Sequence, residues 1–130
     1  MSYRQHYVAF AKLAKKAERY DEMVGYMDVV VDLSSDLTVE EHGLLDDAYH
    51  SAITGRVRRM HVILCQEQVD RYETLYCGKL EDEAAKLCGK ILNLFDHKFL
   101  PLAVAAEDDT NKDFLSSRRR QFERLLWRCA

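Results

Sequence analysis

The stretch from Leu37 to about Val69, LTVEEHGLLDDAYHSAITGRVRRMHVILCQEQV, decides the fold because it predicts one long helix on which the rest of the chain packs. At its start, Thr38 can accept a hydrogen bond from the N–H three residues on, and Glu41 can accept one from the N–H of Thr38, which makes a capping box. Apolar residues then recur at steps of three and four, as on one side of a helix: Leu45, Tyr49, Ala52, Ile53, Met60, Ile63 and Leu64. A helix of roughly thirty residues is about 45 Å long, which indicates an extended, layered protein.

Composition places the chain among ordinary globular domains. Its 130 residues are 48% hydrophobic, with a mean hydropathy of -0.36, and one proline and five glycines leave long helices uninterrupted. The net charge of -3 gives no general reason to expect nucleic acid or an anionic membrane as a partner. No apolar run reaches the roughly 20 residues that span a bilayer, and the N-terminus has no signal-peptide core, so we expect a cytoplasmic protein.

The same periodicity, with a few turn signals, predicts the other helices. We expect helices over residues 2–16, 18–33, about 70–100 and 111–130, the first capped by Ser2 and the fourth stopped by Pro101, with a loop over residues 103–109. In the last helix, Leu115, Phe122, Leu125, Leu126 and Cys129 should point inward. No strand-like alternation and no internal repeat is found, so the predicted class is all-α, an antiparallel helical array in one domain over residues 1–130.

The sequence gives little support to catalysis or metal binding. Cys65, Cys77, Cys88 and Cys129 lack the CxxC or CxxH spacing of zinc sites and disulfide frames, so we expect reduced thiols. No catalytic motif and no helical histidine pair is present, and we expect no catalytic residue, no metal and no cofactor. The neighbouring carboxylates Asp46-Asp47 and Asp108-Asp109 point about 100° apart on a helix, which is typical of a solvated surface.

A second face of the long helix carries His50, Val57 and His61 within about 40° of one another. These histidines could bind an anion when protonated, or they could be half-buried helix residues with no ligand. An arginine ridge in the last helix, defined as Arg120, Arg124 and Arg128 at steps of four, bears on this choice. Guanidinium groups bind phosphate bidentately, and if the two helices lie side by side, the ridge and the histidines would face one groove.

Three segments carry a resemblance to a known family. The first, LAKKAERYDEM (residues 13–23), resembles the junction of the first two helices of 14-3-3 proteins. The second, LTVEE (residues 37–41) with Leu44-Leu45 and Ala48-Tyr49, resembles the start of their third helix. The third, ILNLFD (residues 91–96) with Phe99-Leu100-Pro101, is similar to the end of their fourth helix. The resemblance implies a non-enzymatic, all-α protomer that dimerises through its N-terminal helices and clamps phosphoserine or phosphothreonine segments in a groove. It also implies a dimerisation region over residues 1–100 and the start of a groove helix over residues 111–130.

The dimer contacts of the family carry over with suitable residue types. Its apolar contacts fall on Leu13, Ala17, Ile63 and Tyr76, and its ion pairs across the dimer fall on Arg19 with Glu83 and on Glu22 with Lys79. Such exposed pairs contribute only about 0–1 kcal/mol each, so the apolar patch would supply most of the affinity. The alternative is that these residues are merely helix surface.

The phosphate site of the family carries over poorly. The two main arginines of the family fall on Val57 and Arg124, and its tyrosine falls on Leu125. Its two lysines fall on His50 and Ser117, and its further arginine falls on His61. Only Arg124 keeps the residue type of the family. Arg56 and Arg58 flank Val57, but a shift of one residue turns a side chain by about 100°. We therefore expect anion binding to depend on Arg124, Arg120 and protonated His50 and His61, and to strengthen below about pH 6.5.

The resemblance thus implies a cytoplasmic adaptor, a homodimer or heterodimer that binds phosphorylated proteins or peptides through an altered pocket. A rival hypothesis is a degenerate member that serves dimerisation or binds non-phosphorylated partners only. A third, that the arginine ridge binds nucleic acid or anionic lipid, is disfavoured by the net charge.

Overall fold

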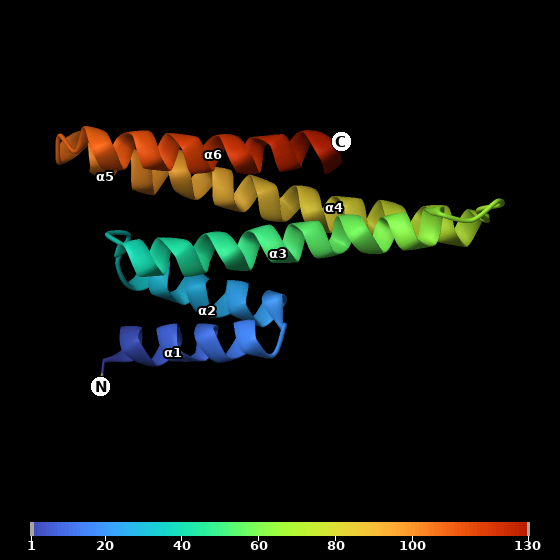
Figure 1. Ribbon diagram of the computed structural model, residues 1–130, viewed down its shortest axis with the longest axis horizontal. Coiled ribbons are helices and arrows are strands. Elements are labelled where there is room, and N and C mark those ends of the chain that lie inside the picture. Colours follow the sequence, from blue (N-terminus) through green and yellow to red (C-terminus); the bar gives the residue numbers. More distant parts are fainter. Residues whose placement is uncertain (1, 130) are drawn as a thin grey trace.

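Helices running back and forth in an antiparallel array make up the part of the chain that the computed structural model describes, which is the backbone of residues 2–129 and the side chains of residues 2–126. In chain order the elements are α1 (Tyr3–Lys16), α2 (Tyr20–Leu33), α3 (Val39–Leu64), α4 (Arg71–Leu94), the π-helical turn η1 (Phe95–Phe99), α5 (Leu100–Ala105) and α6 (Asp109–Cys129). Figure 1 shows α1, α2, α3, α4 and α6 stacked in this order. No strand occurs among the described residues, and the all-α class is confirmed.

The starts of α1 and α3 lie where local capping chemistry predicts them, whereas α2 begins two residues later than predicted, without a side-chain cap, and α6 two residues earlier. The hydroxyl of Ser2 accepts from the N–H of Gln5 at 3.2 Å and caps α1. At the start of α3, the hydroxyl of Thr38 accepts from the N–H of Glu41 at 3.1 Å, and the Glu41 carboxylate accepts from the N–H of Thr38 at 2.8 Å. Both capping boxes satisfy backbone donors that a helix start would otherwise leave unpaired.

The long helix ends earlier than predicted. We expected it to reach about Val69, but α3 ends at Leu64. The amide of Gln66 donates to the carbonyl oxygen of Ile63 at 2.7 Å, and Asp70 opens α4 with a capping box of its own, accepting from the N–H of Glu73 at 2.8 Å. Side-chain caps therefore end one helix and start the next without a glycine or proline, which is why apolar periodicity did not reveal the break.

The prediction that the fourth helix stops at Pro101 is wrong. The backbone widens into η1 and continues as α5, where proline occupies the first turn. Proline lacks an N–H and is tolerated in the first turn, where that donor has no helical partner, and a π turn before it re-aims the chain. The predicted loop over residues 103–109 shrinks to residues 106–108, and the carboxylate of Asp108 accepts from the N–H of Asn111 at 3.0 Å to open α6.

The helices α3 and α4 form a hairpin that extends past the ends of α1 and α2 (Figure 1). Where α2 and α4 flank α3, Tyr49 is fully buried and its hydroxyl donates to Asp28 at 2.5 Å. Toward the hairpin tip nothing in the described part of the chain covers the apolar side chains, and five large ones are exposed: Val62, Leu64, Tyr72, Leu75 and Tyr76. The array therefore leaves an apolar surface on its protruding end.

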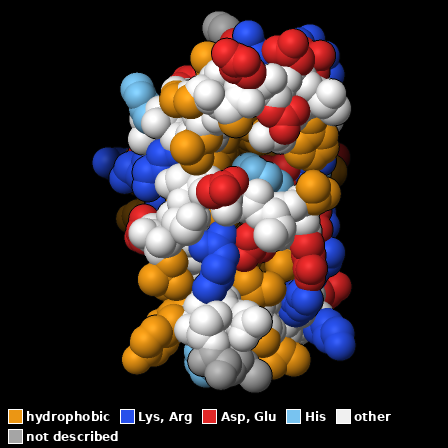
Figure 2. Space-filling model, turned by 90° about the vertical axis from the view of Figure 1, so that its left-hand side faces the viewer, with side chains coloured by type: hydrophobic (Ala, Val, Ile, Leu, Met, Phe, Trp, Pro, Cys, Tyr) orange, Lys and Arg blue, Asp and Glu red, His pale blue; other side chains and the backbone are white. Residues whose placement is uncertain are grey.

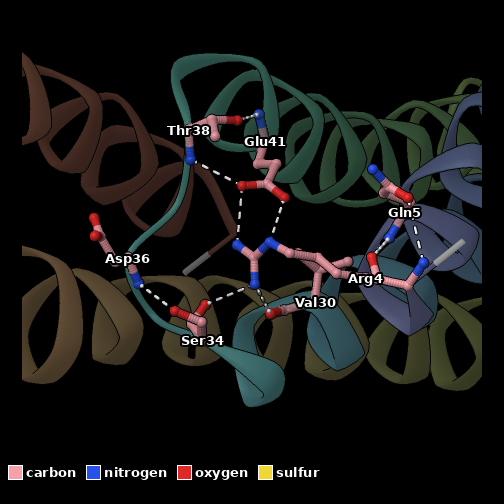
Figure 3. A network of polar contacts seen from close by, with 8 residues as sticks. Arg4, Gln5, Val30, Ser34, Asp36, Thr38 and Glu41 are labelled. Atoms are coloured by element: carbon pink, nitrogen blue, oxygen red, sulfur yellow. Dashed lines mark hydrogen bonds and ion pairs between the residues drawn. The ribbon is translucent and has the colours of Figure 1, made fainter.

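A buried charge network joins α1, α2 and α3 at the other end of the array (Figure 3). The Nε and Nη2 atoms of Arg4 donate to the two carboxylate oxygens of Glu41 at 2.7 and 2.9 Å, and Nη1 donates to the carbonyl oxygen of Val30 at 3.2 Å. Burial on its own would raise the pKa of Glu41, but the Arg4 guanidinium and the bonds from Thr38 outweigh it, and the pKa is lowered. This network fixes the start of α3 against both N-terminal helices.

Candidate functional site

Helices α3 and α6 run in the same direction (Figure 1) and are joined by an ion pair between Asp46 and Arg118, whose Oδ2 and Nε atoms lie 2.5 Å apart. α6 packs chiefly against α4 and contacts α3 over a shorter stretch. From the ion pair, His50 lies four residues further along α3 and Arg124 six residues further along α6. At about 1.5 Å per residue these two positions are within about 3 Å of the same level along the helices.

The predicted anion ligands are exposed side chains. His50 and His61 on α3 and Arg120 and Arg124 on α6 are all open to solvent, and neither of these arginines forms an ion pair with a described carboxylate. Ser117 is exposed as well. The side chains of Arg128 and Cys129 lie outside the described residues. The predicted anion ligands are therefore accessible from solvent.

The two apolar replacements in the predicted pocket face the protein interior. Val57 is half-buried and packs against the core, and Leu125 is 6% exposed and belongs to that core. Neither side chain can supply a hydrogen bond to a phosphate. An anion at this site would meet guanidinium and imidazole groups but would lack the contacts that these two positions provide in the family pattern.

Arg56 does not replace the missing arginine at Val57. Its Nη1 and Nη2 atoms donate to the Asp21 carboxylate at 2.8 and 3.0 Å, and its Nε donates to Glu83 at 3.1 Å. The side chain is only 13% exposed, so it is committed to joining α2, α3 and α4. Arg58 is exposed and lines a cleft of about 540 Å³ between the start of α2 and the middle of α3.

The residues predicted to form the dimer contacts lie on two separate surfaces of the chain. Leu13 is 57% exposed and Ala17 is exposed at the end of α1, whereas Tyr76 is 53% exposed and Ile63 half-buried on the hairpin of α3 and α4. The charged members have partners within the chain: Arg19 pairs with Glu22 at 2.5 Å, Glu83 pairs with Arg56, and Lys79 lies over the ring of Tyr76 at 5.8 Å from its centroid.

The prediction that the neighbouring aspartates are a solvated surface is wrong for Asp46, whereas Asp108 and Asp109 are exposed as predicted. The side chain of Asp46 is 2% exposed, and burial raises its pKa to about 6 even though Arg118 opposes the shift. Its neighbour Asp47 is partly solvated and pairs with Lys15 at 2.8 Å. Burial of Asp46 depends on α6, which lies more than 60 residues away in sequence, so local pattern could not show it.

A buried histidine lies one turn before Asp46. His42 is 7% exposed, its ring meets the ring of Phe99 edge-on at 4.9 Å, and burial lowers its pKa. Among the described residues, Nδ1 of His42, Oδ1 of Asp46 and Nε of Arg118 lack a hydrogen-bond partner, so the contact between Arg118 and Asp46 is an ion pair without good hydrogen-bond geometry. The sequence analysis missed the pair of His42 and Asp46, although the spacing of four residues between His42, Asp46 and His50 places all three on one side of α3.

The charge distribution is mixed at the end of the array that holds the starts of α3 and α6. Figure 2 shows positive and negative side chains interleaved with apolar ones over this face. Within residues 2–126, no group of three or more His, Cys, Asp or Glu side chains is placed to hold a metal ion. No helix that the structure describes is both long enough and apolar enough to cross a bilayer.

Taken together, the antiparallel array and its cation-bearing helices define an all-α protein of the helical-array class. Comparison with known proteins agrees: the family model "14-3-3 protein" matches residues 10–119. The chain is 38% identical to the 14-3-3-like protein GF14-C of Oryza sativa subsp. japonica over 95% of its own length and 51% of that protein, and 34% identical to 14-3-3 protein epsilon of Drosophila melanogaster over 97% and 50%. It is 38% identical to 14-3-3 protein 3 of Entamoeba histolytica over 80% and 47%.

The chain therefore belongs to the 14-3-3 family. It spans about half the length of the curated relatives it matches.

Proposed function

We propose that the protein is a dimeric adaptor that binds phosphoserine or phosphothreonine segments of partner proteins along the exposed faces of α3 and α6. The observation that supports this best is the placement of Arg124 at the level of His50, with Arg124 and Arg120 paired to no described carboxylate. Family membership supports the same role. The proposal is for binding and not for catalysis.

Phosphate binding by this chain should be weaker than by a complete family pocket. A charge-assisted hydrogen bond contributes about 1.5–3 kcal/mol, so losing the contacts at Val57 and Leu125 weakens affinity tenfold or more. Arg124 would make the main bidentate contact, Arg120 would add positive charge, and the two imidazoles would contribute when protonated.

A pull-down separates phosphate-dependent binding from the rival hypothesis. The immobilised protein is offered one cell lysate with its phosphates intact and the same lysate after phosphatase treatment. We expect the bound proteins to depend on phosphorylation. The same set of proteins from both lysates would instead indicate a member that serves dimerisation or binds non-phosphorylated partners only.

The two histidines give the binding a pH dependence. A protonated imidazole attracts a phosphate and a neutral one does not, so with His50 and His61 in the site a phosphopeptide should bind more tightly in acid. Phosphoserine itself takes up a proton at about pH 6, so the native chain and His50→Gln/His61→Gln are compared at each pH by fluorescence anisotropy. We expect the native chain to bind more tightly than the variant by a factor that is severalfold larger at pH 5.5 than at pH 7.5. The same ratio of affinities at both pH values would remove the histidines from the site.

The exposed apolar residues support dimerisation through the N-terminal helices. Leu13 and Ala17 lie at the end of α1 beside which the hairpin of α3 and α4 protrudes, and Tyr76 and Ile63 lie on that hairpin. In a two-fold arrangement, the α1 surface of one protomer can cover the hairpin surface of its partner and the reverse. Both apolar surfaces would then be buried in the same interface.

Leu13→Glu should weaken the dimer at least about tenfold, because it places a charge in an apolar contact. Analytical ultracentrifugation over a concentration series measures the change. Leu33→Glu is the matched control, since Leu33 is 50% exposed at the far end of α2. Equal dissociation constants for both variants would place the interface elsewhere, and a native chain that stays monomeric alone but pairs with a relative would indicate a heterodimer.

A further inference from the structure

Among the described residues, Arg118 forms an ion pair with a buried carboxylate of another helix, which the two ridge residues near it do not. The ridge residues Arg120 and Arg124 face solvent, whereas Arg118 crosses from α6 to α3 and pairs with Asp46 at 2.5 Å. Its guanidinium carbon lies 5.9 Å from the centroid of the Phe114 ring. The side chain is still 29% exposed, so part of it reaches the surface between the two helices.

The partner of Arg118 is an unusual carboxylate. Asp46 is 2% exposed, and its Oδ1 atom accepts no hydrogen bond from any described residue. A buried carboxylate costs free energy unless charges and donors compensate it, and here one guanidinium provides the compensation. Asp46 is also one helical turn before His50, on the side of α3 that carries the predicted anion ligands.

We propose that Arg118 is a further anion-binding residue of the groove and that Asp46 holds it out of use by competing with the ligand for its guanidinium group. The proposal rests on the proposed function, because the ligand is the same phosphorylated segment. Asp46 forms an ion pair with Nε of Arg118, an atom that has no hydrogen bond of good geometry among the described residues, so Asp46 competes with a phosphate by neutralising and orienting the guanidinium and not by occupying all of its donors. Asp46 would therefore lower the affinity for phosphate.

The other paired arginines at this end do not fit the same role. Arg56 is 13% exposed and held by two carboxylates, and Arg119 donates to Asp96 at 2.6 and 3.1 Å and to Glu123 at 3.0 Å. Arg118 has one carboxylate partner, Asp46, which lies one turn before His50 on α3. Release of a single contact is enough to free it.

Neutralising Asp46 tests the competition. Native protein, Asp46→Asn, Asp47→Asn and Asp46→Asn/Arg118→Gln are titrated at pH 7.5 with a degenerate 15-residue peptide library that carries one central phosphoserine. We expect Asp46→Asn to bind at least about fivefold tighter, because the freed guanidinium adds a charge-assisted contact. Asp47→Asn, which removes the neighbouring charge, should match the native protein, and the double variant should lose the gain. No gain in Asp46→Asn, or a gain kept without Arg118, would overturn the proposal.

A second readout separates this proposal from the proposed function. Inorganic phosphate is titrated while NMR follows the side-chain Nε–Hε resonance of Arg118, which must shift in Asp46→Asn and much less in the native chain. If no phosphopeptide binds either protein but phosphate shifts this resonance in Asp46→Asn, the proposed adaptor function is wrong and the proposal for Arg118 is supported. If the native chain binds the phosphopeptide and Asp46→Asn gives neither tighter binding nor the shift, the adaptor function is supported and the proposal for Arg118 is wrong.

Discussion

Replacing Glu41 with glutamine is expected to lower the free energy of unfolding by about 2–3 kcal/mol at pH 7, as measured by urea denaturation. The substitution keeps the size of the side chain and removes its charge. Glu41 is 6% exposed and accepts two hydrogen bonds from Arg4, so the variant leaves a largely buried guanidinium without its counter-ion. The start of α3 is fixed to α1 and α2 through this network (Figure 3), and all three helices lose part of their attachment.

The effect should also depend on pH in a defined direction. The pKa of Glu41 is lowered in the folded chain, so its contribution to stability is complete above the ordinary glutamate pKa of about 4.3 and is lost as the pH falls through the lowered value. The difference between native and Glu41→Gln should therefore shrink in acid. Glu40→Gln is the control, because Glu40 is next in sequence and its ion pair with Lys12 is 61% exposed on the glutamate side. If Glu40→Gln lowered the free energy of unfolding as much as Glu41→Gln does, the stabilising role of the buried network would be contradicted.

Replacing Asp46 with asparagine should have the opposite effect and stabilise the protein by about 2–3 kcal/mol at pH 7.5. Burial raises the pKa of Asp46 to about 6, whereas an unfolded aspartate has a pKa of about 3.9. Above pH 6 the folded chain must keep a desolvated negative charge that the unfolded chain exposes to water. Asparagine removes this charge, and Arg118, whose side chain is 29% exposed, can turn toward solvent.

The sign of this effect follows from proton binding. Between about pH 4 and 6 the folded chain binds the Asp46 proton more readily than the unfolded chain, so the native protein gains stability from this group as the pH falls. The advantage of Asp46→Asn should therefore be about half as large at pH 5 and disappear near pH 4. Asp47→Asn should change stability little at any of these values, since Asp47 is partly solvated. An Asp46→Asn variant that is no more stable than the native chain at pH 7.5 would show that Arg118 fully compensates the buried charge.

Features set by residues a few positions apart were predictable from the sequence. The capping boxes at Ser2 and Thr38 depend on residues three positions along the chain, and both helix starts are confirmed. The helix ends were harder to predict, because Gln66 caps the end of α3 through a side-chain hydrogen bond and η1 lets the helical chain continue through Pro101. Neither device disturbs the apolar periodicity on which the prediction depended.

Features set by distant parts of the chain could not be predicted. Asp46 has the local sequence of a surface residue and becomes buried only when α6 brings Arg118 to it. Arg56 and Arg58 are equivalent neighbours of Val57 in sequence, but Asp21 and Glu83 from two other helices commit the first and leave the second exposed. The exposure of His50, His61, Arg120 and Arg124 agrees with their predicted role as anion ligands, and that role stays a prediction.

Calorimetric titration with the phosphoserine peptide library and with its unphosphorylated counterpart tests the central claim most directly, namely that Arg124 and its neighbours on α3 and α6 bind a phosphate. We predict that the native protein binds the phosphorylated library at least about tenfold more tightly and that Arg124→Gln removes this preference while the protein stays folded. Equal affinities of the native protein for both libraries would contradict the account.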